Sequence, residues 1–152
     1  MLLYRIGHTM YAKNLDGEGA KINGGRWNDI GAPCIYSSVS RALALLEYTC
    51  HVKKHLIPRD LSFVTYDVPD HSLETYTIGQ LPGNWKQWPQ PKEPRDFGTA
   101  FLKANKFLLY VIPSVVIEDE MNVIINPAHP DMPLVKIIDV KDYAYDLRLK
   151  TN

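Results

Sequence analysis

The sequence contains little cysteine and no excess of either charge. Cys34 and Cys50 are the only cysteines among 152 residues, too few for a disulfide framework, and both lie in segments expected to be buried. Lys plus Arg and Asp plus Glu number 17 each, so no global field favours nucleic acid or an anionic membrane as a partner. No apolar run is long enough to span a bilayer, and the first residues lack the features of a signal peptide. We expect a soluble, cytoplasmic protein.

Most motifs that mark a known binding or catalytic chemistry are also missing. The stretch GEGAKING has Ile22 where a dinucleotide-binding fingerprint requires glycine, and neither GxxxxGK[ST] nor GxSxG occurs. The five histidines are scattered. His51 and His55 have helical spacing but lack the intervening glutamate of a zinc protease. We therefore predict no metal site.

The residues that are present are typical of one globular domain. A chain of 152 residues, 45% hydrophobic and 22% charged, can form one hydrophobic core and leaves little room for a second. Alternating and continuous apolar stretches predict an α+β fold in which strands dominate. The run KFLLYVIP favours a central strand that is covered on both faces. Strands are predicted over residues 2–6, 34–37, 61–69, 106–113, part of 115–127, 134–140 and 145–149.

One principal helix is predicted early in the chain. Ser38 or Ser40 can cap a helix that runs to about Lys54, because ALALLEY contains strong helix formers and neither glycine nor proline. A shorter helix is expected to start at Asp96.

Residues 16–33 are rich in Gly, Asn and Asp and predict a long irregular loop. Loops of that length inside a compact domain are usually functional. Arg26 follows Gly24 and Gly25 in this segment, and glycines let a backbone approach a ligand closely. A guanidinium suits phosphate or carboxylate because it donates two parallel hydrogen bonds. A surface arginine without a ligand is the alternative that the residues leave open.

Glu47 is a carboxylate on the apolar face of the predicted helix. Helical spacing places it with Leu43, Leu46 and Cys50, which are expected to face the core. A buried carboxylate is costly unless it is paired or hydrogen-bonded, and such groups concentrate at functional sites. Two other interpretations stay open: Glu47 reaches solvent at the edge of the face, or it forms a structural ion pair with an arginine.

Three further residues are candidates with competing structural roles. Tyr36 can stack on a planar ligand or fill the core with its hydroxyl satisfied. Ser114 follows the most apolar run, where ligand groups gather, but a serine there can equally cap a turn. Asn122, Asn126 and His129 are expected to build a turn, since Asn-Pro and His-Pro are common turn dipeptides.

Taken together, these residues resemble the two signatures of the RES domain family, named for an Arg, a Glu and a Ser. GEGAKINGGRWNDIGAPCIYSSVSRALALLEY resembles the first signature, with the Arg at Arg26 and the Glu at Glu47. VIPSVVIEDEMNVIINPAHPD resembles the second, with the Ser at Ser114 and the asparagine turn at Asn126. The resemblance spans essentially the whole chain and fails mainly in residues 70–94, which are rich in proline and tryptophan.

The resemblance implies that residues 1–152 form a single RES domain. Its fold is expected to be α+β, with a strand-rich core similar to that of the ADP-ribosyltransferases and with NAD⁺ bound as substrate in a cleft. Such a cleft needs no Rossmann fingerprint. Family members are toxins of bacterial toxin–antitoxin systems, usually encoded with an Xre-type helix-turn-helix antitoxin. The resemblance therefore implies a hetero-oligomer with such an antitoxin, no direct contact with nucleic acid, and growth arrest when the toxin acts alone.

The resemblance also assigns roles to individual residues. It implies that Glu47, Arg26 and Tyr36 are catalytic, and that Arg26, Tyr36, Ser114 and Asn126 contact NAD⁺. The expected reaction is cleavage of the nicotinamide–ribose bond with water or phosphate as acceptor. A protein side chain as acceptor would instead make the chain an ADP-ribosyltransferase. A third alternative is a catalytically inactive module that only binds the antitoxin.

Overall fold

A seven-stranded sheet forms the frame of the structure, a computed structural model that describes residues 1–53 and 55–150. The strand order is β4-β5-β6-β2-β1-β3-β7. Neighbouring strands are antiparallel except for β4 and β5, which are parallel. The strands are β1 (Leu2–His8), β2 (Ile35–Ser38), β3 (Leu61–Asp67), β4 (Leu73–Thr75), β5 (Leu109–Pro113), β6 (Met121–Ile125) and β7 (Lys136–Tyr143).

Helix α2 (Arg41–His51) is the early helix that the sequence predicts. It begins after Ser40, whose Oγ accepts the N–H of Leu43 at 3.1 Å. Ser40 rather than Ser38 is therefore the cap, and it satisfies one of the free N–H groups of the first turn. The helix ends at His51, short of the predicted end at Lys54, a residue that lies outside the described part of the chain.

Helix α3 (Lys92–Ala104) corrects the prediction of one principal helix, because its 13 residues exceed the 11 of α2. It starts earlier than the predicted start at Asp96. Pro91 is extended and precedes the helix, and Pro94 lies in the first turn, where the missing N–H of proline has no helical partner to lose. Asn105, in the left-handed conformation with φ of 51°, ends the helix.

Four local predictions were wrong. Residues 16–33 are not wholly irregular, since they contain helix α1 (Glu18–Asn23). Leu147–Leu149 form a 3₁₀ helix rather than a strand, with Asp146 as its cap. Strand β5 is buried as expected but lies next to the edge strand β4 rather than at the centre of the sheet. Cys34 is buried as expected, whereas Cys50 is exposed.

The register of the strands brings polar side chains together on one face of the sheet. Tyr4 of β1 pairs with Ser38 of β2, Ser38 pairs with Asn122 of β6, and Asn122 pairs with Ile112 of β5. Residues directly opposite each other across strands point to the same face. Tyr4, Ser38 and Asn122 therefore form a polar row across three adjacent strands, and the apolar Ile112 continues it onto β5.

Two apolar clusters flank this row on the same face. The cluster on the α2 side includes Ile6, Ala44, Leu61, Phe63 and Tyr145. The cluster on the α3 side includes Trp27, Trp85, Phe101, Tyr110 and Ile124. A third cluster, built around Leu3, Val64, Val123 and Ile125, covers the opposite face.

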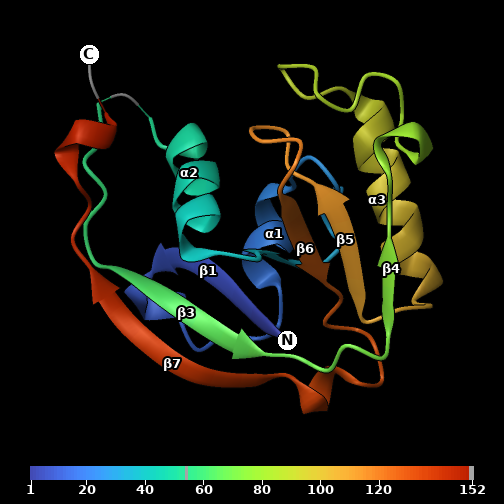
Figure 1. Cartoon of the computed structure of the whole chain (residues 1–152), viewed down its shortest axis with the longest axis horizontal. Coiled ribbons are helices and arrows are strands. Elements are labelled where there is room, and N and C mark those ends of the chain that lie inside the picture. The colour runs from blue at the N-terminus through green and yellow to red at the C-terminus, as the bar shows by residue number, and fades with distance from the viewer. Residues whose placement is uncertain (54, 151–152) are drawn as a thin grey trace.

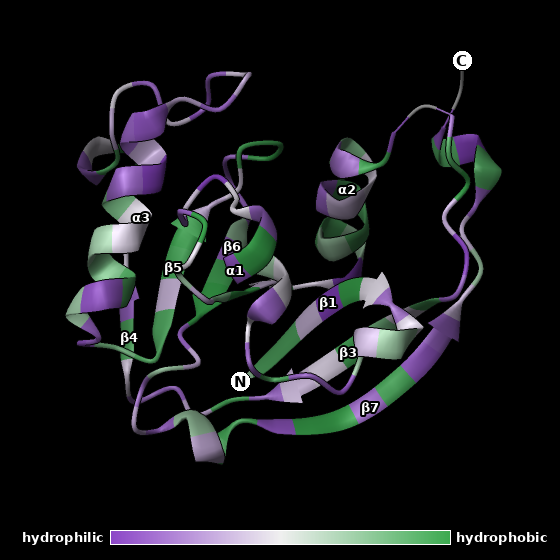
Figure 2. Cartoon of the chain, turned by 180° about the vertical axis from the view of Figure 1, so that it is seen from behind, coloured by the Kyte–Doolittle hydropathy of each residue, from purple (hydrophilic) through white to green (hydrophobic). Residues whose placement is uncertain are grey.

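The helices lie over different parts of the sheet. Figure 1 shows α2 on the side of β1 and β3, and α3 on the side of β4 and β5. Figure 2 shows that β5 and β6 are mainly hydrophobic, whereas the edge strand β7 alternates between hydrophobic and hydrophilic residues. Such alternation is expected of an edge strand with one face in solvent. The polar row on β2 and β6 thus lies between two separately packed halves.

Candidate active site

A cavity of about 990 Å³ lies over the polar row of the sheet. This volume is at the upper end of the range of about 300–1,000 Å³ typical of small-molecule sites. Side chains from β1, β2, α2, β5 and β6 line it, together with parts of residues 14–27 and 86–90. Arg26, Tyr36 and Glu47, all predicted from the sequence, are among the lining residues.

Glu47 is half-buried, and two side chains donate hydrogen bonds to the same carboxylate oxygen. Ser114 Oγ donates to Oε1 at 2.6 Å, and Asn122 Nδ2 donates to Oε1 at 2.5 Å. Among residues 1–53 and 55–150, no hydrogen bond or ion pair involves Oε2 of Glu47. One oxygen of Glu47 is therefore held by the protein and the other is available to a ligand in the cavity.

The geometry around Ser114 fixes the direction of its hydroxyl. Ser114 is fully buried, and its Oγ accepts the N–H groups of Val116 and Ile117, both at 3.1 Å. Because these bonds occupy the lone pairs of Oγ, the single hydroxyl proton is directed to Glu47. The turn that follows β5 thus positions a donor next to the carboxylate. Ser114 is fully buried and does not line the cavity, so the structure places it against Glu47 rather than in the expected contact with NAD⁺.

Asn122 belongs to the same arrangement, although the sequence analysis assigned it only to a turn. Ser38 Oγ donates to Asn122 Oδ1 at 2.7 Å, so the amide group is oriented with its NH₂ toward Glu47. Ser38 and Asn122 are cross-strand partners. Asn122 lies two residues before Ile124 in β6, so the two side chains share one face, and the period of two along a predicted strand is the signal that could have placed Asn122 there.

Arg26 is half-buried and lines the cavity, but part of its guanidinium is already bound by the protein. Its Nη1 donates to the carbonyl oxygens of Trp85 at 2.7 Å and Gln87 at 3.0 Å. Burial lowers the pKa of Arg26, and the nearby Glu47 and Tyr36 oppose that shift. Arg26 therefore links residues 85–87 to the cavity, with its other N–H groups left to reach a ligand.

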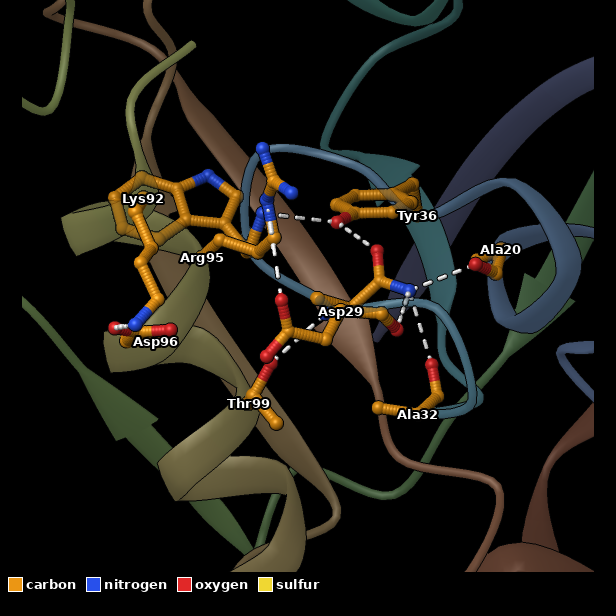
Figure 3. Close-up of polar contacts among 10 residues, drawn as sticks. Ala20, Asp29, Ala32, Tyr36, Lys92, Arg95, Asp96 and Thr99 are labelled. Carbon is orange, nitrogen blue, oxygen red and sulfur yellow. Dashed lines mark hydrogen bonds and ion pairs between the residues drawn. The ribbon is translucent and has the colours of Figure 1, made fainter.

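Tyr36 contributes its ring to the cavity while its hydroxyl is occupied. The hydroxyl donates to Asn28 Oδ1 at 2.6 Å and accepts the Trp27 N–H at 3.1 Å. Asn28 Nδ2 in turn donates to the carbonyl oxygens of Ala20 at 2.8 Å and Ala32 at 2.9 Å (Figure 3). Burial raises the pKa of Tyr36 well above its usual value. The phenol is thus a neutral structural group, and only its ring can contact a ligand.

Two glycines allow the loop with Arg26 to pack this closely. A Cβ on Gly25 would lie 2.7 Å from the Tyr36 hydroxyl, and a Cβ on Gly98 would lie 2.0 Å from the Trp27 carbonyl oxygen. Figure 3 shows the same loop fixed to α3 through the Asp29 N–H, which Thr99 Oγ1 accepts at 2.8 Å. The position of Arg26 is therefore set by direct contact between the loop and α3.

Asn126 is not brought to the cavity, which corrects the expectation that it contacts NAD⁺. It is buried, and its Nδ2 donates to Leu102 O at 3.0 Å and to Asn105 Oδ1 at 2.9 Å. Its Oδ1 accepts the Ala128 N–H at 3.1 Å. These bonds join the turn after β6 to the C-terminus of α3. The predicted turn is therefore correct, and the side chain is used to stabilise it.

Across residues 1–53 and 55–150, no group of three or more His, Cys, Asp or Glu is arranged to hold a metal ion. In the same part of the chain, no helix is both long enough and apolar enough to cross a membrane.

Comparisons with known proteins agree with the resemblance. The profile of the RES domain matches residues 2–148. The Prs ADP-ribosylating toxin of Sphingobium sp. (strain YBL2) is 39% identical over 144 residues, covering 93% of this chain and 89% of that protein. The protein named Toxin Res of Photorhabdus laumondii is 32% identical, covering 98% of this chain and 97% of that protein.

A solved structure has a similar fold. A chain of the crystal structure of the M. tuberculosis MbcT–MbcA toxin–antitoxin complex superposes with a TM-score of 0.73 at 18% identity, covering 94% of this chain and 84% of that one. The α+β fold class predicted from the sequence is thereby confirmed. With the family profile over nearly the whole chain and relatives above 30% identity, this chain belongs to the RES domain family of toxins.

Proposed function

We propose that this protein is a toxin that cleaves NAD⁺ at the nicotinamide–ribose bond. The observation that carries the proposal is the arrangement of Glu47. Its Oε1 accepts two hydrogen bonds from Ser114 and Asn122, and its Oε2 is available to a ligand in a cavity of about 990 Å³. A single carboxylate held in this way suits a reaction that develops positive charge on a ribose.

The chemistry of NAD⁺ cleavage requires only one carboxylate. When the N-glycosidic bond breaks, its electron pair moves to the pyridinium nitrogen, and nicotinamide leaves as a neutral molecule. No general acid is needed, in contrast to most glycosidases, which use two carboxylates. The ribose becomes oxocarbenium-like, and a preorganised negative charge stabilises it. Glu47 fills this role, with Oε2 also able to accept a hydrogen bond from a ribose hydroxyl.

The other residues bind and orient the substrate. The guanidinium N–H groups of Arg26 that the protein does not use can donate to the phosphate groups of NAD⁺. The ring of Tyr36 can stack on the nicotinamide or pack against its ribose. Ser114 and Asn122 act through Glu47 rather than on the substrate, and Asn126 has no part in the site.

The acceptor defines the reaction. Water would give a glycohydrolase and inorganic phosphate a phosphorylase, and these two are the favoured outcomes. The second candidate is ADP-ribosylation of a protein, which the printed name of the 39% identical Sphingobium relative supports. All three reactions share the same oxocarbenium-like state and differ in what reaches its open face.

The proposal includes an antitoxin partner. Toxins of this family are usually encoded with an Xre-type helix-turn-helix antitoxin, and the similar fold was solved as part of a toxin–antitoxin complex. The formal net charge of zero agrees with DNA binding being left to that partner, in a cytoplasmic hetero-oligomer.

The test is product analysis with the purified protein, freed of any antitoxin. NAD⁺ is incubated with wild type and with Glu47→Gln, with and without phosphate and with cell lysate as a source of protein acceptors. Gln keeps the shape and one oxygen that Ser114 and Asn122 can bond, so the variant removes the negative charge and the free acceptor oxygen but leaves the side chain in place. We expect nicotinamide from wild type and a rate at least about 100-fold lower from the variant.

The second product identifies the acceptor. Free ADP-ribose indicates water, ADP-ribose 1-phosphate indicates phosphate, and labelled lysate protein indicates ADP-ribosylation. Intact NAD⁺ under all three conditions would contradict the proposal and favour the inactive antitoxin-binding module. Equal rates for wild type and Glu47→Gln would contradict the role of Glu47 alone.

A further inference from the structure

Residues 82–91, between β4 and α3, contribute three side chains to the cavity. Lys86, Trp88 and Gln90 line it. These residues belong to the part of the sequence that does not resemble the family signatures. Figure 1 shows the segment extending from the α3 side toward the loop that joins β5 and β6. The segment therefore adds a wall to the cavity that the strands and α2 do not provide.

The 82–91 segment is anchored on both sides of Lys86. Arg26 Nη1 donates to the carbonyl oxygens of Trp85 and Gln87, which surround that residue. The side chain of Lys86 pairs with Glu118 in the loop between β5 and β6. Trp85 is only 5% exposed and packs in the apolar cluster beneath α3. The backbone that leads to Trp88 is thus held in place by a buried indole, an ion pair and Arg26.

Trp88 differs from the other two tryptophans of the chain in its exposure. Trp27 and Trp85 are 6% and 5% exposed, whereas Trp88 is 69% exposed. A large indole in solvent gives up the stabilisation that burial would provide. It lies at the edge of the cavity on an anchored backbone, which is the placement required of a surface for stacking a planar ring.

The proposed reaction decides which ring reaches Trp88. The nicotinamide ribose must contact Glu47, which is half-buried over the polar row of the sheet. The phosphates of NAD⁺ are assigned to Arg26, whose guanidinium holds the carbonyl oxygen of Gln87 next to Trp88. The adenosine half, which follows the phosphates, is therefore expected near Trp88. Resting on the proposed function, we propose that Trp88 stacks on the adenine base of NAD⁺ and determines the affinity for its purine end.

Fluorescence tests this binding without any turnover. Trp88 is the solvent-exposed indole, so acrylamide quenches its emission selectively. Wild-type protein is titrated with AMP, ADP-ribose and nicotinamide mononucleotide. We expect AMP and ADP-ribose to change the emission and to protect it from acrylamide, and nicotinamide mononucleotide to do neither. The Trp88→Ala variant should lose both responses. Protection by nicotinamide mononucleotide but not by AMP would overturn the assignment to adenine.

Kinetics give an independent readout. We expect Trp88→Ala to raise KM for NAD⁺ about tenfold with kcat within about twofold, and Trp88→Phe to recover part of the affinity because a ring remains. Gly83→Ala is the matched control, because Gly83 lies in the same segment, is exposed, does not line the cavity and has no atom within 4 Å of an added Cβ. It should match wild type.

The outcomes separate the inference from the proposed function. An active enzyme whose KM is the same in wild type and Trp88→Ala would overturn the stacking role and leave NAD⁺ cleavage intact. Wild-type protein that neither cleaves NAD⁺ nor responds to ADP-ribose would overturn the proposed function, and the stacking role with it. An equal rise in KM for Gly83→Ala would show a general disturbance of the segment and overturn a specific contact by Trp88.

Discussion

Ser114 Oγ and Glu47 Oε1 are joined by a hydrogen bond of 2.6 Å, although the two residues lie 67 positions apart in the chain. The bond connects the turn after β5 to the half-buried part of α2 that carries Glu47. Asn122 of β6 adds a second bond to the same oxygen. Since one donor follows β5 and the other lies in β6, the sheet and its turn rather than the helix fix how the carboxylate is presented to the cavity.

The first prediction concerns the hydrogen bonds that fix the carboxylate of Glu47. Asn122→Ala removes one of the two bonds to Oε1 and lets the carboxylate rotate. We expect kcat for NAD⁺ cleavage to fall about 10- to 100-fold with KM within about twofold, because small errors in the position of a catalytic group are costly. Steady-state kinetics measures both constants. A change in KM with kcat preserved would instead place Asn122 in substrate binding.

Asn126→Ala is the matched control for that variant. Its side chain makes bonds to Leu102, Asn105 and Ala128 but does not line the cavity. We expect a loss of about 2–4 kcal/mol in the free energy of unfolding, seen as a Tm lower by about 4–16 °C. The kcat of the folded variant should stay near that of wild type. Thermal unfolding and activity at 20 °C below the midpoint separate the two effects.

The second prediction concerns the contact between α3 and the loop with Arg26. Gly98→Ala places a Cβ about 2.0 Å from the Trp27 carbonyl oxygen, so one of the two must move. Overpacking of this kind costs about 1–3 kcal/mol. We expect a lower Tm and a higher KM, because Arg26 moves with the loop. Gly79→Ala is the control, since no atom lies within 4 Å of its added Cβ. Equal Tm values for the two variants would show that the loop is not fixed by this contact.

The third prediction concerns Tyr36 at alkaline pH. Burial raises its pKa well above the usual value, so the folded protein keeps the proton that the unfolded chain releases near pH 10. The stability from this group is present below about pH 10 and is lost as the pH rises further. Tyr36→Phe should be less stable at neutral pH, because the bonds to Asn28 and Trp27 are lost. Its free energy of unfolding should then fall less steeply above pH 10 than that of wild type. Urea unfolding between pH 8 and 11 measures this slope, and parallel slopes would contradict it.

The fourth prediction uses the two thiols. Both thiols line the cavity, but Cys34 is buried, which raises its pKa from 9.0 to about 12, whereas Cys50 is exposed. A disulfide reagent at pH 8 should label Cys50 alone in the folded protein and reach Cys34 only on unfolding. Burial and the nearby Glu47 raise the pKa of Cys50. Glu47→Gln should therefore speed its labelling, and ADP-ribose should slow it. Labelling of Cys34 at the same rate would contradict its burial.

The fold class could be predicted because it depends on helices and strands, and these are indicated by local sequence patterns. Period-two alternation identified β1, β3 and β7, and the run of strong helix formers after Ser40 identified α2. The start of α3 could not be read, since prolines at positions 91 and 94 indicate loop on their own and are compatible with a helix only in its first turn.

Part of the candidate site could also be predicted from local sequence. Arg26, Tyr36, Glu47 and Ser114 stood out through unusual residue types in apolar or glycine-rich surroundings, and the structure brings all four to one region. Asn126 stood out equally and lies elsewhere. Asn122 did not stand out, because its role depends on a cross-strand partner, Ser38, that is far away in the sequence.

The sequence by itself therefore determined the elements, the apolar faces and the residue types available for chemistry. Local hydrogen bonding and hydrophobic periodicity depend on residues within a few positions of one another. Only the tertiary structure decided that Oε1 of Glu47 is held and Oε2 is not, that Arg26 shares its guanidinium with residues 85 and 87, and that Trp88 lies at the cavity. Each of these arrangements depends on segments that are dozens of residues apart in the sequence. The strand register and the packing of the loop on α3 bring those segments together.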